Sequence, residues 1–332
     1  MKKSRRIIVS GDPAILNDDL LRGLVESGFE IDRCPEREPS IGDIRAKLPG
    51  AVGYLFGGFE YLDVETLRCG DSLRAVSLLG EDAAGFLDLN AAKEMQIQVT
   101  NTPGATTNAV AEFIIAEMLA HGRRMAQVIC PSSSGTENHS NRQARELSSQ
   151  QIGIVGLGRI GLKVAQSLRT AFGASVCYWN RSRKKDVEDA LGIQYKDLNS
   201  LMGSSDFIVI TIASDNSTEG LLGSPELNLL PFGSSLICVS KSRVLDFRVL
   251  LDLLKIGHLD SAWIDWFDRK FHLDQISDSQ LTRDIESCNG RLHLSAHVAN
   301  DTKDAWDRMS TMATRSLHSL LTSRSDQYEV RS

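Results

Sequence analysis

The sequence predicts an α/β protein built on parallel sheets, and three observations support this prediction. Short apolar runs alternate with amphipathic stretches along the whole chain. A glycine-rich turn at residues 156–161 separates an apolar run from an amphipathic one. The 332 residues suffice for two domains that each bury a core. Repeated strand–helix units of this kind indicate parallel sheets that helices cover on both faces.

The first hundred residues contain four apolar runs that predict buried strands, and the stretches between them have helical spacing. The expected strands are residues 7–9, 51–56, 75–79 and 97–100. The expected helices are residues 17–26, 66–70 and 87–93. This alternation predicts a first parallel sheet in the N-terminal part of the chain.

A longer helix is expected at residues 109–125, where apolar residues occur on most sides of the helix. Such a helix is buried, either between domains or between subunits. Residues 131–149 are almost free of apolar side chains and indicate a surface loop or linker. A second series of strands then follows, at residues 151–155, 175–179, 207–212, 236–239, 262–266 and 292–294.

The bulk properties exclude some classes of function. A net charge of −6 argues against nucleic-acid binding, which basic faces drive. No apolar stretch approaches the roughly 20 residues of a membrane span. The six cysteines are scattered, with no pair at metal-binding spacing, and indicate free thiols in a reducing compartment. The N-terminus leaves no room for a signal peptide, so we expect a cytoplasmic protein without nucleic-acid or membrane partners.

The glycine-rich turn has the pattern of a dinucleotide-binding site. Gly156 permits the tight turn after the strand, and Gly158 lets the backbone approach a pyrophosphate. Gly161 lets the following helix pack closely on the strand. Arg159 and Ile160 begin that helix, whose N-terminal amides would hold the pyrophosphate.

The residues after the next strand bear on the choice of cofactor. An NAD site usually places an acidic side chain there, on the ribose 2′-hydroxyl. This chain has Asn180 followed by Arg181, Ser182 and Arg183, and guanidinium groups suit a 2′-phosphate. NADP(H) is therefore the predicted cofactor, with NAD(H) as the alternative if the arginines only face solvent. Ala213, after the strand at 207–212, is also expected at the cofactor.

Further stretches resemble the D-2-hydroxyacid dehydrogenase family, which includes phosphoglycerate, formate and glyoxylate/hydroxypyruvate enzymes. Residues 88–93 and 99–104 look like the end of that family's first segment. Residues 108–112 look like the start of its long interdomain helix, and residues 153–161 match its dinucleotide motif. The resemblance covers nearly the whole chain.

The resemblance implies a Rossmann dinucleotide-binding domain inserted into a flavodoxin-like substrate domain. We expect the substrate domain at residues 1–103 plus 299–332 and the NAD(P)-binding domain at residues 104–298. The active site would lie in the cleft between them and bind a small-molecule substrate. The resemblance also implies a homodimer built on the long helix.

The family's catalysts are an arginine, a glutamate and a histidine, and only the histidine is kept here, as His297. Lys241 stands at the arginine position, and Ser242 replaces the glycine that follows it. Lys270 stands at the glutamate position. Asp265 matches the family residue that contacts the nicotinamide carboxamide.

These exchanges change the chemistry that the resemblance implies. Lys241 keeps a positive charge but loses the planar fork that grips a carboxylate through two hydrogen bonds. Lys270 reverses a charge, and a cation beside His297 disfavours the imidazolium that would donate a proton. We therefore expect the family's usual proton donor to be less populated at neutral pH.

The predicted substrate-binding residues lie in the first hundred residues: Phe56, Gly57, Gly58, Glu81 and Asp82. Gly57 and Gly58 resemble a pair whose backbone amides bind substrate in one branch of the family. Glu81 and Asp82 replace a glycine-rich, carboxylate-binding turn. They would repel a carboxylate, yet they could neutralise Lys270 or bind a cationic group. The alternative is that they face solvent.

Two functions remain open at this level. The first is an NAD(P)H-dependent oxidoreductase that reduces a carbonyl or imine of a small organic acid-like substrate, with His297 as proton donor and Lys241 polarising the acceptor oxygen. The second is a catalytically silent dinucleotide-binding protein with a regulatory or assembly role, because two catalytic positions are altered. No metal is expected, since no carboxylate or cysteine completes a site at His293 and His297.

Overall fold

The computed structural model divides into two compact units, Met1–Thr106 with Thr302–Ser332, and Thr107–Asp301. These boundaries lie three residues beyond the expected ones at each crossing. The structure describes residues 5–34, 36, 39–123, 125, 144–268, 271–272, 277–288, 290–323 and 325–330.

The first unit contains a five-stranded parallel sheet in the order β2-β1-β3-β4-β5. This order is that of flavodoxin-like sheets. Its elements are β1 (Arg6–Ser10), α1 (Asp18–Glu26), β2 (Glu30–Arg33), α2 (Ile41–Lys47), β3 (Ala51–Phe56), α3 (Val64–Arg68), β4 (Ala75–Leu78), α4 (Leu89–Glu94), β5 (Gln98–Thr100) and α14 (Lys303–Ser323).

Helices cover both faces of this sheet, because successive side chains of a strand point to opposite faces. On one face, Ile8 and Tyr54 pack in a core with residues of α2, α3 and α4. On the other face, Ile7 and Leu55 pack with residues of α1 and α14. The C-terminal helix α14 therefore completes the core that the N-terminal residues begin.

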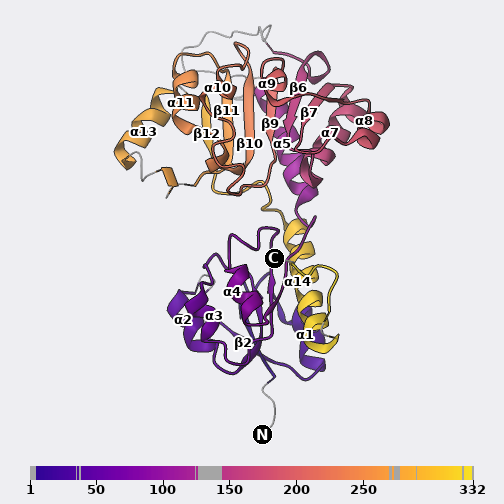
Figure 1. Cartoon of the computed structure of the whole chain (residues 1–332), viewed down its shortest axis with the longest axis vertical. Helices are drawn as coiled ribbons and strands as arrows, with labels where there is room; N and C mark the ends of the chain where they lie inside the picture. The colour runs from indigo at the N-terminus through magenta and orange to yellow at the C-terminus, as the bar shows by residue number, and fades with distance from the viewer. Residues whose placement is uncertain are drawn as a thin grey trace. The chain divides into compact units, whose positions relative to one another are not determined.

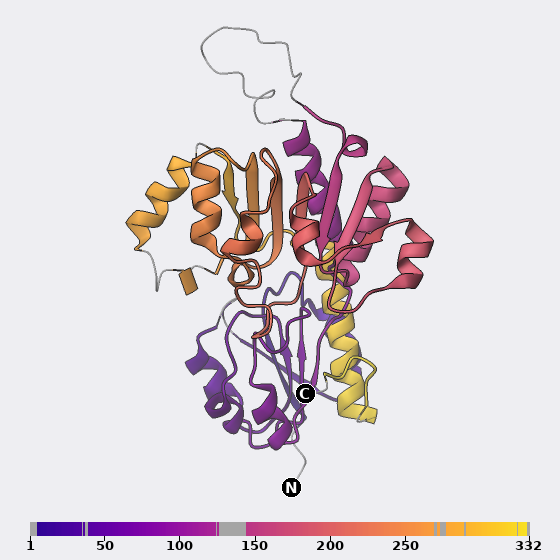
Figure 2. The ribbon, with the colours of Figure 1, turned by 45° about the horizontal axis from the view of Figure 1, so that its top comes forward.

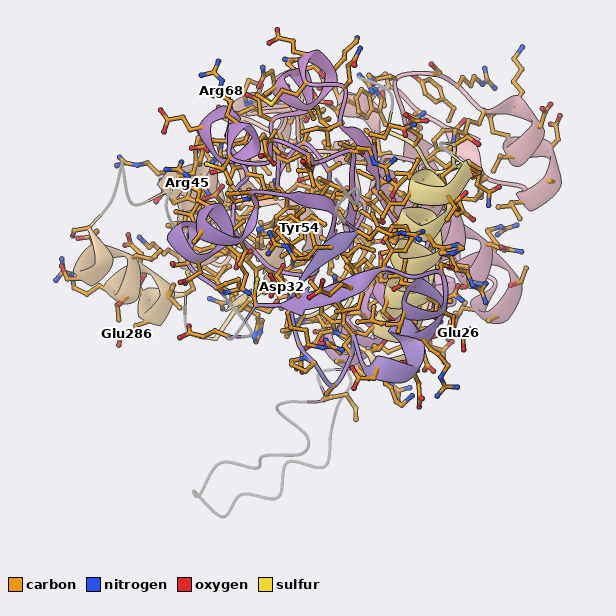
Figure 3. The ribbon with its side chains drawn as sticks, turned by 90° about the horizontal axis from the view of Figure 1, so that it is seen from below. Glu26, Asp32, Arg45, Tyr54, Arg68 and Glu286 are labelled. Carbon is orange, nitrogen blue, oxygen red and sulfur yellow. The ribbon has the colours of Figure 1, made fainter. Side chains whose placement is uncertain are left out.

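The edge strand β2 is absent from the sequence prediction because it lacks an apolar run, and none of its residues is buried. Its carboxylate Asp32, labelled in Figure 3, accepts a hydrogen bond from Arg6 Nη1 on β1 at 2.6 Å. A second ion pair joins Asp32 to Lys47 at the end of α2. Polar contacts thus attach a strand that hydrophobic patterning does not reveal.

The second unit contains a seven-stranded parallel sheet in the order β12-β11-β10-β9-β6-β7-β8. Its strands are β6 (Gln151–Val155), β7 (Ser175–Trp179), β8 (Gln194–Tyr195), β9 (Phe207–Ile210), β10 (Ser235–Lys241), β11 (Ser261–Trp266) and β12 (Leu292–Leu294). The order reverses between β6 and β9, which is the topological switch point of a Rossmann sheet.

The helices and 3-10 turns of this unit are α5 (Thr107–Gly122), η1 (Leu147–Ser149), α7 (Arg159–Phe172), α8 (Lys185–Leu191), α9 (Leu198–Met202), α10 (Ser224–Leu227), η2 (Ser242–Val244), α11 (Phe247–Lys255) and α13 (Asp278–Ser287). Ile208 and Ile210 pack with residues of α9, α10, α11 and α13, whereas Phe207 and Val209 pack with residues of α5 and α7. The helices of this unit surround its sheet in Figures 1 and 2. The predicted α/β class with two helix-covered parallel sheets is confirmed.

The predicted long helix at 109–125 is observed as α5, which begins two residues earlier and ends at Gly122. Most of the predicted linker at 131–149 lies outside the described residues. The described cysteines Cys34, Cys69, Cys177, Cys238 and Cys288 are free thiols, while Cys130 lies outside the described residues. Within the described ranges, no helix combines the length and apolarity needed to cross a membrane.

A buried histidine near the end of α5 makes the second unit sensitive to acid. The His121 ring lies 5.2 Å from the ring of His293, which stacks on Trp263. Burial, reinforced by the charge of His293 and opposed by Asp260, lowers the pKa of His121 to about 4. Burial also raises the pKa of Glu117, whose carboxylate lies 3.6 Å from His121. The neutral forms of both groups are therefore favoured.

We expect the free energy of unfolding to fall as the pH drops from 7 to 5. In this interval His121 is protonated in the unfolded chain but stays neutral in the folded protein. His121→Phe keeps an aromatic ring that does not titrate. The free energy of unfolding of this variant should therefore fall by about 2 kcal/mol less than that of the parent between pH 7 and pH 5. Urea unfolding at both pH values, followed by tryptophan fluorescence, measures the difference. Equal losses in the parent and the variant would contradict this account.

Candidate functional site

The glycine-rich turn joins the carboxyl end of β6 to α7 and is built for close approach. Gly156 adopts φ +101°, and its carbonyl accepts a 2.6 Å hydrogen bond from the Thr211 hydroxyl. A Cβ at Gly161 would lie 2.1 Å from the Gly156 carbonyl oxygen, so only glycine fits there. A Cβ at Gly158 would meet nothing within 4 Å. The space beside Gly158 is thus open to a ligand at the start of α7.

Two side chains from the loop after β7 bind the middle of this turn. Asn180 Oδ1 accepts a hydrogen bond of 3.3 Å from the Leu157 amide. The Lys184 ammonium donates to the Leu157 carbonyl at 2.5 Å. The sequence prediction missed Lys184, although it belongs to the basic run that contains the arginines. Its ammonium lies beside the glycine-rich turn, where a dinucleotide would bind.

The guanidinium of Arg183, a predicted cofactor residue, is paired with a carboxylate. Its guanidinium donates to both carboxylate oxygens of Glu188, at 2.9 Å from Nε and 2.7 Å from Nη2. Glu188 also accepts from the Tyr178 hydroxyl at 2.8 Å. This bidentate pair holds Arg183 against α8 through Nε and Nη2, while Nη1 takes no part in these bonds.

Arg181 and Ser182 are placed differently from Arg183. Both side chains are exposed, and the Ser182 carbonyl accepts from Asn180 Nδ2 at 3.0 Å. The positive charge of Arg181 contributes to lowering the pKa of Asp215, after the larger effect of hydrogen bonds from Ser217. The charge of Arg181 thus acts on a carboxylate of the loop that follows β9.

The loop after β9 is fixed through its backbone. The carbonyl of Ala213, a predicted cofactor residue, accepts from the Thr218 hydroxyl at 2.7 Å. The preceding carbonyl, of Ile212, accepts from the Ser240 hydroxyl on β10 at 2.6 Å. These bonds place Ala213 at the carboxyl edge of the sheet, next to the glycine-rich turn that Ile212 contacts at Gly156.

Two of the predicted catalytic residues meet at one aromatic ring. The Lys241 ammonium, at the end of β10, lies 4.5 Å from the centroid of the Trp266 ring. The His297 imidazole stacks on the same ring, with centroids 4.1 Å apart and planes inclined by 18°. The contact of Trp266 with both residues was not predicted from the sequence. Lys270 lies outside the described residues.

Asp265 holds the turn that carries His297. This carboxylate is 1% exposed, and its Oδ1 accepts from the Val298 amide at 2.8 Å and the Ala299 amide at 3.1 Å. Its backbone carbonyl accepts from the His297 amide at 2.7 Å. His297 adopts φ +59°, a conformation that non-glycine residues rarely take. Oδ2 takes no part in these bonds to the turn.

In the first unit, the predicted glycine pair lies at the carboxyl end of β3. The Gly57 amide donates to the Ser10 carbonyl at 3.1 Å, so this predicted substrate-binding amide is paired within its own unit. The side chain of Phe56 is only 2% exposed and belongs to the core, which leaves only its backbone for a ligand. Gly58 is partly exposed beside it.

The two acids after β4 accept hydrogen bonds from backbone amides of the first unit. Glu81 Oε1 accepts from the Gly104 amide at 2.7 Å, and Asp82 Oδ1 accepts from the Gly85 amide at 3.0 Å. Each carboxylate therefore satisfies a backbone donor of its own unit. A small apolar pocket lies near the glycine pair and is lined by Asp12, Ile15, Leu16, Gly57, Phe59, Leu79 and Trp306.

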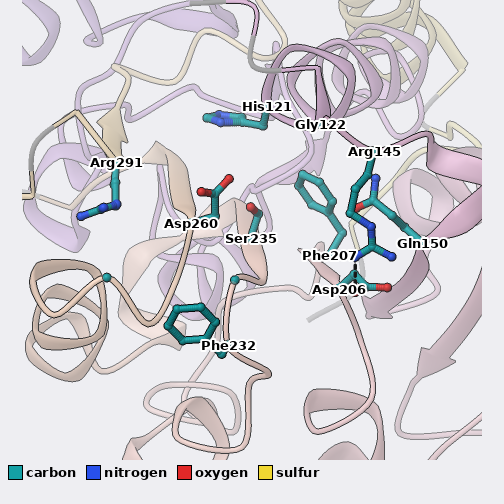
Figure 4. A pocket seen from close by; sticks show the side chains of 12 residues that line it. His121, Gly122, Arg145, Gln150, Asp206, Phe207, Phe232, Ser235, Asp260 and Arg291 are labelled. Carbon is teal, nitrogen blue, oxygen red and sulfur yellow. Dashed lines mark hydrogen bonds and ion pairs between the residues drawn. The ribbon is translucent and has the colours of Figure 1, made fainter. Parts of the chain in front are cut away.

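A larger cavity, of about 300 Å³, lies at the amino ends of the strands of the second unit (Figure 4). Arg145 and Asp206 form an ion pair of 2.6 Å on its wall. The predicted cofactor residues belong to the opposite, carboxyl edge of this sheet, so none of them lines this cavity. Within the described ranges, no group of three or more His, Cys, Asp or Glu side chains could hold a metal.

We expect Gly158→Ala and Gly161→Ala to differ in a way that separates folding from dinucleotide binding. The methyl group of Gly161→Ala must displace backbone, so the melting temperature should fall. Gly158→Ala should leave the melting temperature within about 2 °C, because its methyl group meets open space. Its affinity for NADPH should still fall at least about tenfold, because that space is where the pyrophosphate approaches.

Differential scanning fluorimetry and calorimetric titration with NADPH measure both quantities. Unchanged NADPH affinity in Gly158→Ala would show that no dinucleotide lies against this turn.

Comparisons with known proteins agree with this geometry. Residues 115–299 match the family model described as D-isomer specific 2-hydroxyacid dehydrogenase, NAD binding domain. A protein of Staphylococcus aureus strain USA300, whose name places it among the 2-hydroxyacid dehydrogenases, is 30% identical over 274 residues. The aligned part covers 81% of this chain and 82% of that protein.

Solved structures share the fold over nearly the full length of the chain. The TT0316 protein of Thermus thermophilus aligns with a TM-score of 0.83 and 24% identity, covering 98% of this chain and 100% of its own. A D-lactate dehydrogenase of Treponema pallidum aligns with a TM-score of 0.82 and 20% identity, with the same coverage. An acyclic imino acid reductase in complex with NADPH and D-Arg aligns with a TM-score of 0.81 and 20% identity, covering 98% of this chain and 100% of its own.

The family model covers more than half of the chain. The S. aureus relative is 30% identical to this chain over most of the length of both proteins. The predicted family, with its NAD-binding Rossmann domain and oxidoreductase chemistry, is confirmed. The chain belongs to the D-isomer-specific 2-hydroxyacid dehydrogenases.

Proposed function

We propose that this chain is an NAD(P)H-dependent reductase of a small 2-keto acid or of the corresponding imine, with Lys241 and His297 as its catalytic pair. The observation that carries the proposal is their shared contact with Trp266, at 4.5 Å and 4.1 Å from the ring centroid. Residues separated by more than fifty positions in the sequence thus lie on one side chain at the carboxyl edge of the sheet. Ligands bind at this edge in such folds.

Each residue of the pair has a distinct task. The dinucleotide, when bound, supplies hydride to the acceptor carbon. The Lys241 ammonium stabilises the negative charge that develops on the acceptor oxygen or nitrogen. His297 donates the proton that this atom needs. Its left-handed backbone is strained, and such strain is often found at functional sites.

Trp266 orients the imidazole of His297, a task that a glutamate performs where the family's usual catalysts are present. A glutamate would orient the imidazole through a hydrogen bond and favour its charged form. In this chain the stacked ring fixes the plane of His297 without adding negative charge. The same ring attracts the Lys241 ammonium through its face. We infer that the imidazole of His297 keeps its orientation, but that it lacks the negative charge with which a glutamate would favour its protonated form.

The acceptor remains open between a carbonyl and an imine. Among the solved structures with this fold, the D-lactate dehydrogenase is named for a hydroxy acid, and the imino acid reductase holds D-Arg. Lysine binds a carboxylate as a point charge rather than as a fork, so the substrate's carboxylate would be held less tightly than by arginine. This is compatible with a substrate that brings further polar groups.

We expect His297→Gln to lower kcat roughly 100-fold or more, because the proton donor is lost. Lys241→Ala should lower kcat by a similar factor through the loss of charge stabilisation. The oxidation of NADPH, followed by absorbance with glyoxylate, with hydroxypyruvate, and with pyruvate plus an amine, measures turnover. Lys303→Ala removes an exposed lysine of α14, which pairs with Asp307, and serves as a matched control.

Unchanged turnover in both catalytic-site variants would contradict the proposal. The silent alternative would be favoured if the parent reduces none of these substrates and the double variant Lys241→Arg with Lys270→Glu gains activity.

We propose NADP(H) as the preferred cofactor, on the basis of the loop after β7. Asn180 stands where an acid would repel a 2′-phosphate, and its side chain already holds the Leu157 amide. Lys184 donates to the Leu157 carbonyl, so its ammonium is fixed beside the turn. Arg181, three residues earlier in the same loop, is exposed, whereas Arg183 is paired with Glu188. Lys184 and Arg181 are therefore the proposed phosphate ligands.

We expect Lys184→Ala to weaken NADPH binding by roughly 10- to 100-fold, because a charge-assisted hydrogen bond to the phosphate is lost. NADH binding should change much less, since NADH carries no 2′-phosphate. Arg183→Ala is the matched control, and it should leave the ratio of the two affinities nearly unchanged. Calorimetric titrations with both nucleotides measure the ratio, and an equal loss for NADH would contradict the assignment.

We also propose a homodimer in which α5 takes part. This helix is apolar on most sides, and Leu119 on it is 37% exposed. A helix with this pattern is usually covered by a partner.

A further inference from the structure

The turns that follow β10 and β11 are joined by a compact polar cluster, which we call the Ser242 latch: Ser242, Arg243, Asp268 and His272. The Ser242 hydroxyl accepts from the Asp268 amide at 2.9 Å and bonds His272 Nε2 at 2.8 Å. Arg243 Nε donates to Asp268 Oδ2 at 2.7 Å. The cluster thus connects two segments more than twenty residues apart in the sequence.

The latch is enclosed by aromatic side chains. His272 is 4% exposed and stacks on Phe267, with ring centroids 4.8 Å apart. Phe247 and Phe271 lie 5.0 Å and 5.1 Å from the same ring. Ser242 is fully buried. In such surroundings a broken hydrogen bond leaves an unpaired polar group, which costs more than the bond itself contributes.

The protonation state of His272 follows from these contacts. Burial lowers its pKa, the carboxylate of Asp268 opposes the shift, and the guanidinium of Arg243 adds to it. The ring is therefore neutral at pH 7. The Ser242 hydroxyl can then donate to Nε2 while it accepts from the Asp268 amide, so both bonds of the hydroxyl form together.

The latch lies directly beside the catalytic pair. Ser242 follows Lys241 in the chain, and Asp268 is two residues from Trp266. The family resemblance implies glycine at position 242, and glycine has no hydroxyl to make either bond. The serine therefore gives this chain a connection that holds the segment of Lys241 to the segment of Trp266.

We propose that Ser242 and His272 are positioning residues that keep the Lys241 ammonium over the Trp266 ring. This inference rests on the proposed role of Lys241 in the reaction. Removing the latch should lower kcat rather than cofactor affinity, because the glycine-rich turn and the loop after β7 make no contact with it among the hydrogen bonds of the described residues.

The first test is kinetic. Ser242→Ala and His272→Phe should each lower kcat roughly tenfold, with unchanged KM for NADPH. His272→Gln should recover most of the activity, because its amide oxygen can accept from the Ser242 hydroxyl. As the pH falls below 6.5 toward the lowered pKa of His272, the parent should lose turnover that His272→Gln retains. In a Lys241→Ala background, Ser242→Ala should have no further effect.

The second test does not depend on catalysis. Hydrogen exchange, read by mass spectrometry on peptides covering residues 262–268, should quicken in Ser242→Ala. Ser205→Ala is the matched control, because Ser205 is also fully buried and donates to the Leu201 carbonyl away from the latch. Equal exchange in the two variants would overturn the latch. If exchange quickens but Lys241→Ala keeps full turnover, the proposed function fails while the structural connection stands.

Discussion

The site at the carboxyl end of β11 depends on one buried carboxylate, that of Asp265. Its Oδ1 accepts hydrogen bonds from the Ser295 hydroxyl and from the amides of Val298 and Ala299. Its backbone carbonyl accepts from the His297 amide. Left-handed backbone at a non-glycine residue costs about 1 to 3 kcal/mol, so the turn persists only because its surroundings hold it. These four bonds supply that constraint.

The position of the imidazole follows from this turn. With its backbone fixed by Asp265, His297 stacks on Trp266, the next residue of the same strand. Lys241, paired with Trp266 in the register of β10 and β11, reaches the same ring. The Asp265 carboxylate and the Trp266 indole thus fix the positions of the His297 imidazole and the Lys241 ammonium. We propose that stacking performs here the orienting role that a glutamate holds elsewhere in the family, because it fixes the plane of the imidazole without adding charge.

The sequence predicted the second sheet and the glycine-rich turn well because their signals are local. A strand buried on both faces is an unbroken apolar run, and the glycines at 156 and 161 are required by contacts within a few residues or across one strand. The edge strand β2 was missed because polar contacts attach it. Likewise, the shortness of β8 gives no periodicity to detect.

The side chains of the site were less predictable, because the motifs do not indicate which partners they contact in the fold. Arg183 was expected at a phosphate, but Glu188, five residues later, holds it. Lys184 was overlooked since only the folded loop brings it to the carbonyl of Leu157. The resemblance located Lys241 and His297, yet nothing in the sequence indicated that Trp266 joins them. The motifs therefore indicated which residues belong to the site. The contacts between their side chains became known only from the structure.

The most direct test of the catalytic pair is a crystal structure with NADPH and oxamate, an unreactive analogue of a 2-keto acid. The account predicts that the oxamate carbonyl oxygen lies within hydrogen-bonding distance of both Lys241 Nζ and the His297 imidazole, with the imidazole still stacked on Trp266. A bound analogue that neither side chain reaches, or a His297 ring turned away from Trp266, would contradict it.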